Sequence, residues 1–258
     1  MKAERLHGWG RPQSAAPTDP AVRNRLLRQS VKTPGEAVAP FGIKTGIARW
    51  FEVLICTLGI ILSIPLLFLA SVAIALTSRG PVIFRQQRVG RNGQVFVLYK
   101  LRTMRMGHDG PQITAGGDDR VTWFGKILRR TKVDELPELW NVLKGDMSLV
   151  GPRPEVPRYV DLEDDRWAAV LKSRPGITDP VTLRLRDEEA LLAQVKDYEH
   201  FYLKSLQPLK LQGYVDYLQQ RSWWSDIKVL CNTLLVVVWP KANTPASRHS
   251  YGPKGGGL

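Results

Sequence analysis

Two adjacent carboxylates, Asp134 and Glu135, are the side chains of this 258-residue chain best placed to do chemistry. A short helix is expected directly after them, because Pro137 suits a first helical position, where its missing N–H needs no partner. Gly145 stands where a left-handed helix end is expected. Apolar residues at helical spacing predict one apolar face: Leu136, Leu139, Trp140 and Leu143. The two acids would then lie at the positive end of a helix dipole, which favours their charged forms.

A charged carboxylate at that place can act as a nucleophile or a metal ligand, but an acid pair that only caps the helix has the same spacing. The segment Gly151-Pro152-Arg153-Pro154 favours the chemical interpretation. Its two prolines hold Arg153 in a stiff, extended stretch, as a site that fixes an anion needs. A helix expected over residues 122–130 ends in two arginines and brings a cation, Arg129, within one loop of Asp134.

Positive charge is concentrated in one part of the chain. The formal net charge is +13, and residues 41–105 carry nine Lys or Arg, Arg102 among them, against the single acid Glu52. The net charge of this block is therefore +8. Such a block indicates a partner that carries phosphate: a nucleic acid, a nucleotide or an anionic lipid headgroup.

The length fits one domain with attachments. Residues 1–40 are polar, lack the apolar core of a secretory signal and are expected to be disordered; residues 241–258 are expected to form a flexible tail. Between them we expect a membrane segment over 41–78 and a cytoplasmic domain over 79–240. The two cysteines, Cys56 and Cys231, stand in apolar stretches without metal-ligand spacing and are expected to be buried.

The stretch from Trp50 to Leu76 is almost continuously apolar and exceeds the roughly 20 residues that span a bilayer. One spanning helix is the simplest interpretation. However, Ser63 and Pro65 interrupt its middle, and proline kinks a helix. Both flanks are also basic, which places both on the cytoplasmic side. The sequence therefore favours a re-entrant helix that enters, bends at Ser63 and Pro65, and returns.

The region after the membrane segment mixes helices with a little strand. Residues 81–104 predict a β-hairpin around Asn92-Gly93, with Arg85, Arg88 and Lys100 on one solvent face. The alternation of leucine and arginine over 183–186 resembles a strand. A helix is expected over 188–210, and residues 212–239 are expected to form either one long helix or two helices with a bend near Ser222. The tryptophans near the end of this stretch suit either a membrane interface or a packed core.

Together these pieces carry a family likeness. The chain resembles the bacterial sugar transferases, monotopic phosphoglycosyl transferases that act on polyprenyl phosphate. The match runs from about Ile47 to Trp239. It rests on the apolar segment with its Ser/Pro break and on four motifs: SRGPVIFRQQRVGRNGQVFVLYKLRTM, VDELPELWNVLKGDMSLVGPRP, RPGIT and SWWSDIKVLCNTL.

The resemblance implies a fold and a reaction. The fold is α/β, mostly helical with a small β-hairpin or sheet: a re-entrant membrane helix, a cytoplasmic catalytic domain and interfacial amphipathic helices. The reaction passes a sugar 1-phosphate from a nucleoside diphosphate sugar, usually a UDP-sugar, to a membrane polyprenyl phosphate, and releases UMP. The expected place is the bacterial inner membrane, with the domain facing the cytoplasm. This would be the first membrane step of surface glycan assembly.

The resemblance also implies residue roles. The family's Asp-Glu dyad falls on Asp134, which would attack the β-phosphate and form a covalent phosphosugar intermediate, and on Glu135, which is associated with Mg²⁺. Both acids are therefore expected metal ligands. Four arginines are expected to contact substrate phosphate: Arg102, Arg129, Arg153 and Arg186.

The chain departs from the family pattern after RPGIT, where Asp179-Pro180-Val181-Thr182 replaces the usual Gly, aromatic, Ala and Gln. We therefore expect residues 179–186 to take part in recognition of the sugar or the β-phosphate. The alternative is a structural connection in which Arg184 and Arg186 pair with nearby surface acids.

The expected partners follow from this reaction: UDP-sugar, polyprenyl phosphate and membrane lipid, a second copy of the chain in a homodimer, downstream glycosyltransferases, and no nucleic acid. A different class of function stays open at this point, a non-catalytic basic module that holds anionic lipid or nucleotide at a membrane surface. The sequence does not identify the sugar or the glycan.

Overall fold

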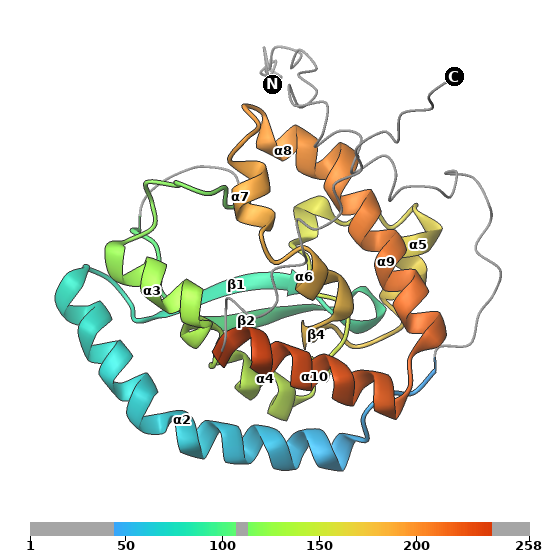
Figure 1. Ribbon diagram of the computed structural model, residues 1–258, viewed down its shortest axis with the longest axis horizontal. Helices are drawn as coiled ribbons and strands as arrows, with labels where there is room; N and C mark the ends of the chain where they lie inside the picture. The colour runs from blue at the N-terminus through green and yellow to red at the C-terminus, as the bar shows by residue number, and fades with distance from the viewer. Residues whose placement is uncertain (1–43, 107–112, 239–258) are drawn as a thin grey trace, which may run out of the picture.

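The computed structural model describes residues 44–106 and 113–238. The extension over 1–40 and the tail over 241–258 lie outside the described residues. Within them the chain is mostly helical around two small sheets, so the expected mixture of helix and a little strand is confirmed (Figure 1).

The elements follow in chain order. They are α2 (Arg49–Thr77), β1 (Ile83–Val89), β2 (Val95–Leu101), α3 (Trp123–Thr131), the short 3₁₀ turn η2 (Val133–Glu135), α4 (Glu138–Lys144), β3 (Ser148–Val150), α5 (Asp165–Val170), β4 (Gly176–Thr178), α6 (Pro180–Arg184), α7 (Glu188–Leu192), α8 (Tyr198–Phe201), the π-helical turn η4 (Tyr202–Leu206), α9 (Gln207–Gln220) and α10 (Trp223–Val238). Short 3₁₀ turns also occur at Arg91–Gly93 and Pro157–Tyr159.

The hairpin forms where it was predicted. Asn92 and Gly93 both have positive φ, 57° and 75°, which explains why Asn-Gly suits this turn. The strands pair with Phe84 opposite Lys100 and Arg88 opposite Phe96. Paired residues share a face and faces alternate along a strand, so Arg88 and Lys100 lie on one face. Arg85 lies on the other, and the prediction of one common face was wrong for it.

The second sheet brings two sequence motifs into backbone contact. Strands β3 and β4 pair in parallel, with Val150 opposite Thr178. Beyond this pair, Gly176 N–H donates to Pro152 at 2.9 Å, and a Cβ on Gly176 would lie 2.1 Å from the nitrogen of Gly151. Glycine is therefore required at the contact. This junction fixes where the extended segment that carries Arg153 begins.

Two predicted elements were wrong. Residues 183–186 do not form a strand, because Pro180–Arg184 is helix α6, which begins at the capping residue Asp179. The helix expected over 188–210 is broken after Leu192, and Asp197 starts α8 by accepting from His200 N–H at 3.0 Å. The break near Ser222 is confirmed, since α9 ends at Gln220 and α10 begins at Trp223.

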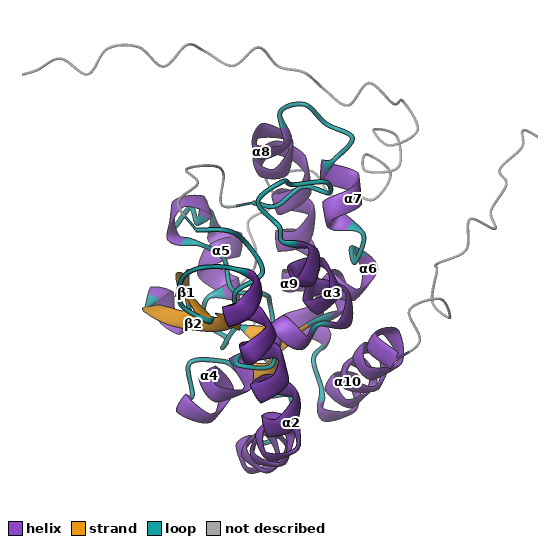
Figure 2. Ribbon diagram, turned by 90° about the vertical axis from the view of Figure 1, so that its left-hand side faces the viewer, coloured by secondary structure: helices purple, strands orange, loops and turns teal. Residues whose placement is uncertain are grey.

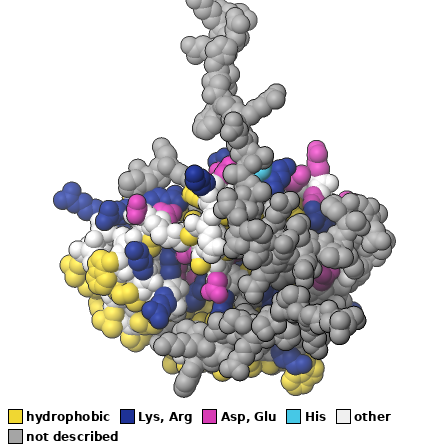
Figure 3. Space-filling view, turned by 45° about the horizontal axis from the view of Figure 1, so that its top comes forward, with side chains coloured by type: hydrophobic (Ala, Val, Ile, Leu, Met, Phe, Trp, Pro, Cys, Tyr) yellow, Lys and Arg dark blue, Asp and Glu magenta, His cyan; other side chains and the backbone are white. Residues whose placement is uncertain are grey.

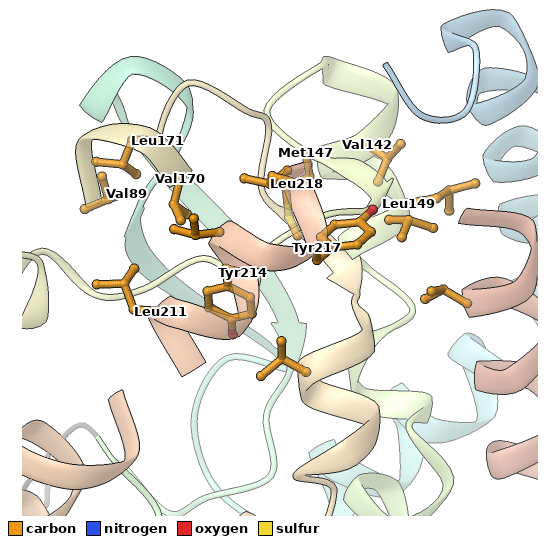
Figure 4. Close-up of a cluster of buried hydrophobic side chains, with 14 of the residues drawn as sticks. Val89, Val142, Met147, Leu149, Val170, Leu171, Leu211, Tyr214, Tyr217 and Leu218 are labelled. Atoms are coloured by element: carbon orange, nitrogen blue, oxygen red, sulfur yellow. The ribbon is translucent and has the colours of Figure 1, made fainter. Parts of the chain in front are cut away.

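The main core lies between α4, α5, α9, α10 and the two sheets. Figure 4 shows its side chains converging from these elements, with aliphatic residues such as Val142, Met147 and Leu218 fully buried. Cys56 is also buried in this core, as predicted, but Cys231 on α10 is exposed, which contradicts that prediction.

Helix α2 is apolar on every side but touches the domain along one narrow stripe. Its buried residues are Glu52, Cys56, Ser63, Ala70 and Ile74. Only 17% of its most apolar 18-residue window is buried, and it is the one helix in the described part of the chain that is long and apolar enough to cross a membrane. Figure 3 shows hydrophobic side chains gathered along the left and lower edges of the molecule. A helix of this kind needs an apolar surrounding other than the domain itself.

Both ends of α2 are fixed to the same domain. A straight helix of 29 residues would be about 43 Å long. Instead α2 bends near its middle, where Pro65 interrupts the backbone ladder, and both arms follow the body above it (Figure 1). At the first end Glu52 accepts from Leu149 N–H at 3.0 Å, and Arg49 donates to Leu143 O at 3.1 Å. At the second end Arg102 donates to Ser78 O at 2.8 Å.

The approach to α2 is held by one buried carboxylate. Asp226 of α10 has 0% exposure and accepts from Ile47 N–H at 3.1 Å, Arg221 Nε at 3.0 Å and Tyr217 OH at 2.7 Å. Arg221 in turn donates to Val150 O at 2.7 Å. This carboxylate therefore joins the entry to α2, strand β3 and both C-terminal helices.

We predict that Asp226→Ala lowers the free energy of unfolding by about 3–5 kcal/mol, because it leaves the buried charge of Arg221 without its partner. Denaturant unfolding of the detergent-solubilised protein, followed by tryptophan fluorescence, measures the change. Asp216→Ala, on the exposed side of α9, is the matched control and should change stability by less than about 0.5 kcal/mol. Equal stability of the two variants would contradict the anchoring role.

Candidate functional site

The two carboxylates lie on a turn of their own between two helices. Helix α3 ends at Lys132, whose φ is +59°, and the chain then forms the 3₁₀ turn η2, which contains Asp134 and Glu135. Helix α4 starts at Glu138, with Pro137 as its cap, and ends at Gly145 with φ +90°. The prediction that the acid pair lies just ahead of a short helix ended by Gly145 is confirmed.

The most buried residues of α4 lie on a different face from the predicted apolar one. Its buried residues are Glu138, Asn141 and Val142, whereas Trp140 is exposed and Leu139 packs near Gly59 of α2. Asn141 is fully buried and bonds the backbone of β2, donating to Val97 O at 2.7 Å and accepting from Tyr99 N–H at 3.1 Å. The polar face is the inner one because it helps to build the site, and the apolar face meets α2.

Asp134 is buried, and one of its two carboxylate oxygens accepts no hydrogen bond from the described residues. Its exposure is 6%, and among the described residues its Oδ1 has no hydrogen-bond partner. Burial and then the negative charge of Glu135 raise the pKa of Asp134, against the opposing effect of nearby cations. An unpaired carboxylate oxygen of this kind can attack an electrophile or accept a metal ion.

Glu135 is held in the charged form by three cations. Its Oε1 lies 2.5 Å from Arg153 Nη2, 3.2 Å from Lys100 Nζ and 3.6 Å from Lys132 Nζ. Burial alone would raise the pKa of Glu135, but the cations outweigh it and hold this pKa well below its usual range. The same pairing raises the pKa of Arg153. The structure thus brings Arg153 against the acid pair, and its predicted contact with substrate phosphate stays a prediction.

A third acid, Glu138, was not predicted. It is 1% exposed and lies 3.0 Å from Lys100 Nζ, so Lys100 bridges Glu135 and Glu138. Burial raises the pKa of Glu138. The sequence held a signal for this group, because Glu138 lies four residues after Asp134 and would share a face with it on a helix.

The other three predicted arginines are placed differently. Arg129 faces the site from α3, but its Nη1 pairs with Glu189 of α7 at 3.0 Å. Arg186 follows α6, and its Nε lies 3.8 Å from Asp187, as in the structural alternative. Arg102 is 3% exposed and donates to Ser78 and Pro81, which joins the hairpin to the end of α2. These bonds give Arg102 a structural role at the wall of the cavity, and its predicted contact with substrate phosphate stays a prediction.

The acid pair, its three cations and the other predicted arginines line one cavity of about 1620 Å³. Asp134 and Glu135 line it, and so do the elements from the hairpin through α3 and α6 to α9. Its cations outnumber its acids. A cavity of this size and charge suits a ligand with several phosphate oxygens.

Sequence comparisons identify the family of the chain. The family described as bacterial sugar transferase matches residues 43–240. The chain belongs to the bacterial sugar transferase family. Its relatives include a UDP-glucose:undecaprenyl-phosphate glucose-1-phosphate transferase of Caulobacter vibrioides, 41% identical over 191 residues, which are 72% of this chain and 67% of the relative.

A second relative of this transferase has another sugar in its name. It is a UDP-N-acetylgalactosamine-undecaprenyl-phosphate N-acetylgalactosaminephosphotransferase of Aeromonas hydrophila, 34% identical over 209 residues, which are 78% of this chain and 46% of the relative. A putative N-acetylgalactosaminyl 1-phosphate transferase of Bacillus subtilis is 43% identical over 117 residues, 45% of this chain and 65% of the relative. The transferase thus spans about half to two thirds of the length of these relatives.

Within the stretch that departs from the family pattern, Asp179 has a structural role. It is fully buried and accepts from Val181 N–H at 2.7 Å and Thr182 N–H at 2.8 Å, which caps α6. Asp-Pro is a helix-start signal, with the acid at the cap and proline at the first position. The alternating leucines and arginines that follow this signal led instead to the prediction of a strand.

We predict that Asp179→Ala lowers the free energy of unfolding by about 1–2 kcal/mol, because the first N–H groups of α6 lose their acceptor. Asp179→Asn, which can still cap, should lose less. Thermal and denaturant unfolding of both variants measure the difference. Full stability of Asp179→Ala would show that the cap contributes nothing.

Proposed function

We propose that this transferase moves a sugar 1-phosphate from a UDP-sugar to undecaprenyl phosphate, giving undecaprenyl diphosphate sugar and UMP. The observation that carries the proposal is the unpaired Oδ1 of Asp134 on the wall of a basic cavity, beside the cation-bound Glu135. The names of the relatives supply the substrate class. They disagree on the sugar, so the donor sugar is left to experiment.

The proposed chemistry has two displacements at one phosphorus. A carboxylate oxygen of Asp134 attacks the β-phosphorus, the bond from that phosphorus to the bridging oxygen breaks, and UMP leaves with the electron pair. A phosphate oxygen of the lipid then attacks the same phosphorus and releases the carboxylate. Phosphoryl transfer depends mainly on positioning and charge neutralisation, which Arg153 and Lys100 supply from two sides.

The carboxylates fit a magnesium ion. Asp134 offers an unpaired oxygen, and the three cations on Glu135 all contact Oε1, which leaves Oε2 available. No group of three or more acidic, His or Cys ligands occurs in the described part of the chain. Mg²⁺ needs only one or two carboxylates together with substrate oxygens. When bound there, it would neutralise charge on the diphosphate.

We also propose that α2 enters one leaflet and returns, at the cytoplasmic face of the inner membrane. Support comes from its apolar surface, its bend at Pro65 and the attachment of both ends to one domain. Helices α4 and α10 flank α2 on its two sides (Figure 2). Exposed tryptophans on these helices and on α3 suit the headgroup layer: Trp123, Trp140 and Trp224. The cavity would then open where a lipid phosphate lies. A homodimer and downstream glycosyltransferase partners stay predictions.

We predict that Asp134→Asn abolishes turnover while the protein stays folded, because an amide cannot displace UMP. The purified enzyme, given UDP-sugar without lipid, should release UMP and gain the mass of a phosphosugar, and the variant should do neither. Asp165→Asn, exposed on α5, is the control and should behave as wild type. Substantial turnover by Asp134→Asn would contradict the covalent mechanism. The non-catalytic alternative, a chain that only binds anionic lipid, predicts that the wild type releases no UMP with any donor.

We predict that activity requires Mg²⁺ or Mn²⁺ and that Glu135→Gln abolishes activity or weakens its metal dependence, because the amide is a poorer ligand than a carboxylate. UMP release is measured after EDTA treatment and again as the metal is restored. Full activity in EDTA would contradict the metal requirement.

We predict that the two ends of α2 lie on the same, cytoplasmic side of the membrane. Cysteines at Lys44 and at Arg79, both exposed, are introduced into a Cys56→Ala/Cys231→Ser background and treated with an impermeant thiol reagent. Neither should react in intact cells and both should react in inverted membrane vesicles, as should a control cysteine at Lys172. Labelling of one end from outside would show a spanning helix. Pro65→Leu should shift α2 toward spanning, because it restores a continuous helix.

A further inference from the structure

Three polar side chains form one wall of the cavity on the side away from α2, and the proposed chemistry does not use them. We call Glu188 of α7, Tyr202 of η4 and Lys210 of α9 the distal wall. Lys210 Nζ lies 2.9 Å from Glu188 Oε2 and 3.2 Å from Oε1, and 5.2 Å from the centre of the Tyr202 ring. The Tyr202 hydroxyl donates to Glu155. Figure 1 shows α7 and α9 above the sheets and α2 below them.

An ion pair such as Lys210–Glu188 is unexpected at this position if its only role is to hold α7 against α9. Its side chains are 10% and 25% exposed, so much of the hydration of both charges is lost. A pair in that position is often no more stabilising than apolar residues of similar size. Both residues line the cavity, so part of the surface that they still expose faces the space where a ligand would bind.

The distal wall is next in sequence to the ion-pair partner of Arg129, an arginine that is expected to contact substrate phosphate. Glu189, the neighbour of Glu188 on α7, pairs with Arg129 at 3.0 Å. If a donor phosphate takes the place of the Glu189 carboxylate on Arg129, a group attached directly to that phosphate comes within reach of Glu188. In a UDP-sugar that group is the sugar.

We infer that the distal wall binds vicinal hydroxyls of the donor sugar and contributes to the choice among UDP-sugars. The Glu188 carboxylate would accept from two neighbouring hydroxyls, Lys210 would donate to one of their oxygens, and Tyr202 would hold the lysine in place. A carboxylate beside an ammonium matches a diol, which both donates and accepts. The ribose of the nucleotide also has vicinal hydroxyls, and the experiment below distinguishes binding of the ribose from binding of the sugar. The inference rests on the proposed function and deepens it.

The test measures kcat/KM for UMP release by the full-length enzyme with undecaprenyl phosphate and Mg²⁺. The donors are UDP-glucose, UDP-galactose, their N-acetylated counterparts, and deoxy analogues of the preferred donor. Glu188→Gln should lower kcat/KM for the preferred donor by about tenfold or more, as expected for a lost bond to a charged group. Glu188→Gln should lower kcat/KM for the less reactive epimeric donor by a smaller factor, so that the selectivity between the two donors falls. The deoxy donor that lacks the contacted hydroxyl should react equally with both enzymes.

Glu199→Gln is the matched control. Glu199 is a partly buried carboxylate on α8 that accepts from Tyr159 OH and pairs with Arg158, but it does not line the cavity. It should leave the donor selectivity unchanged. Lys210→Gln provides a second variant should Glu188→Gln fold poorly, and thermal unfolding is measured for each.

The outcomes separate the inference from the proposed function. An equal loss for every sugar donor would mean that the pair is structural and would overturn the inference. Loss of discrimination between ribose and 2′-deoxyribose donors, with unchanged sugar selectivity, would assign the wall to the nucleoside and also overturn it. Absence of UMP release by the wild type with every donor would instead contradict the proposed function itself.

Discussion

The ion cluster around Glu135 is the interaction on which the site depends. Its three cations come from separate parts of the chain: Lys100 from β2, Lys132 from the turn after α3, and Arg153 from the extended segment after β3. Burying one carboxylate with one cation would gain little, because both lose hydration. Several cations on a single oxygen outweigh that loss, and they also draw the three segments together. The hairpin, the acid turn and the second sheet are thus placed relative to one another by the same charge that the proposed chemistry needs.

Local signals were enough to predict the acid pair and several elements. The Asn92-Gly93 turn and the glycine end of α4 follow from φ preferences of single residues, which the sequence displays directly. The α6 helix also had a local signal in Asp179-Pro180, which was given less weight than the alternating leucines and arginines. The break after Leu192 lacks a glycine or proline and depends on the packing of α7 and α8 in a second core cluster. Sequence spacing gives no information about such packing.

The errors at the site have a common physical cause. The spacing of apolar residues predicted one apolar face on α4, but spacing does not tell which face of a helix is the most buried, and the interior beside α4 is a charged cavity. Glu138 and Lys210 were missed for a related reason. Each pairs with a residue more than twenty positions away, and only the folded chain brings them together. Arg102 looked like its neighbours in the basic block, and only its burial against Ser78 distinguishes it.

The pair between Arg129 and Glu189 also bears on what happens before any substrate arrives. A tethered carboxylate acts as a local competitor, and tethering commonly corresponds to effective concentrations in the millimolar range. A simple anion such as inorganic phosphate, if it contacts Arg129 alone, has to be present at a similar millimolar concentration to displace the Glu189 carboxylate. On the proposed function, a diphosphate would also contact Arg153 and Lys100 and would therefore displace the Glu189 carboxylate more easily. On the proposed function, this internal ion pair would make the cavity discriminate among anions by the number of phosphate groups they carry.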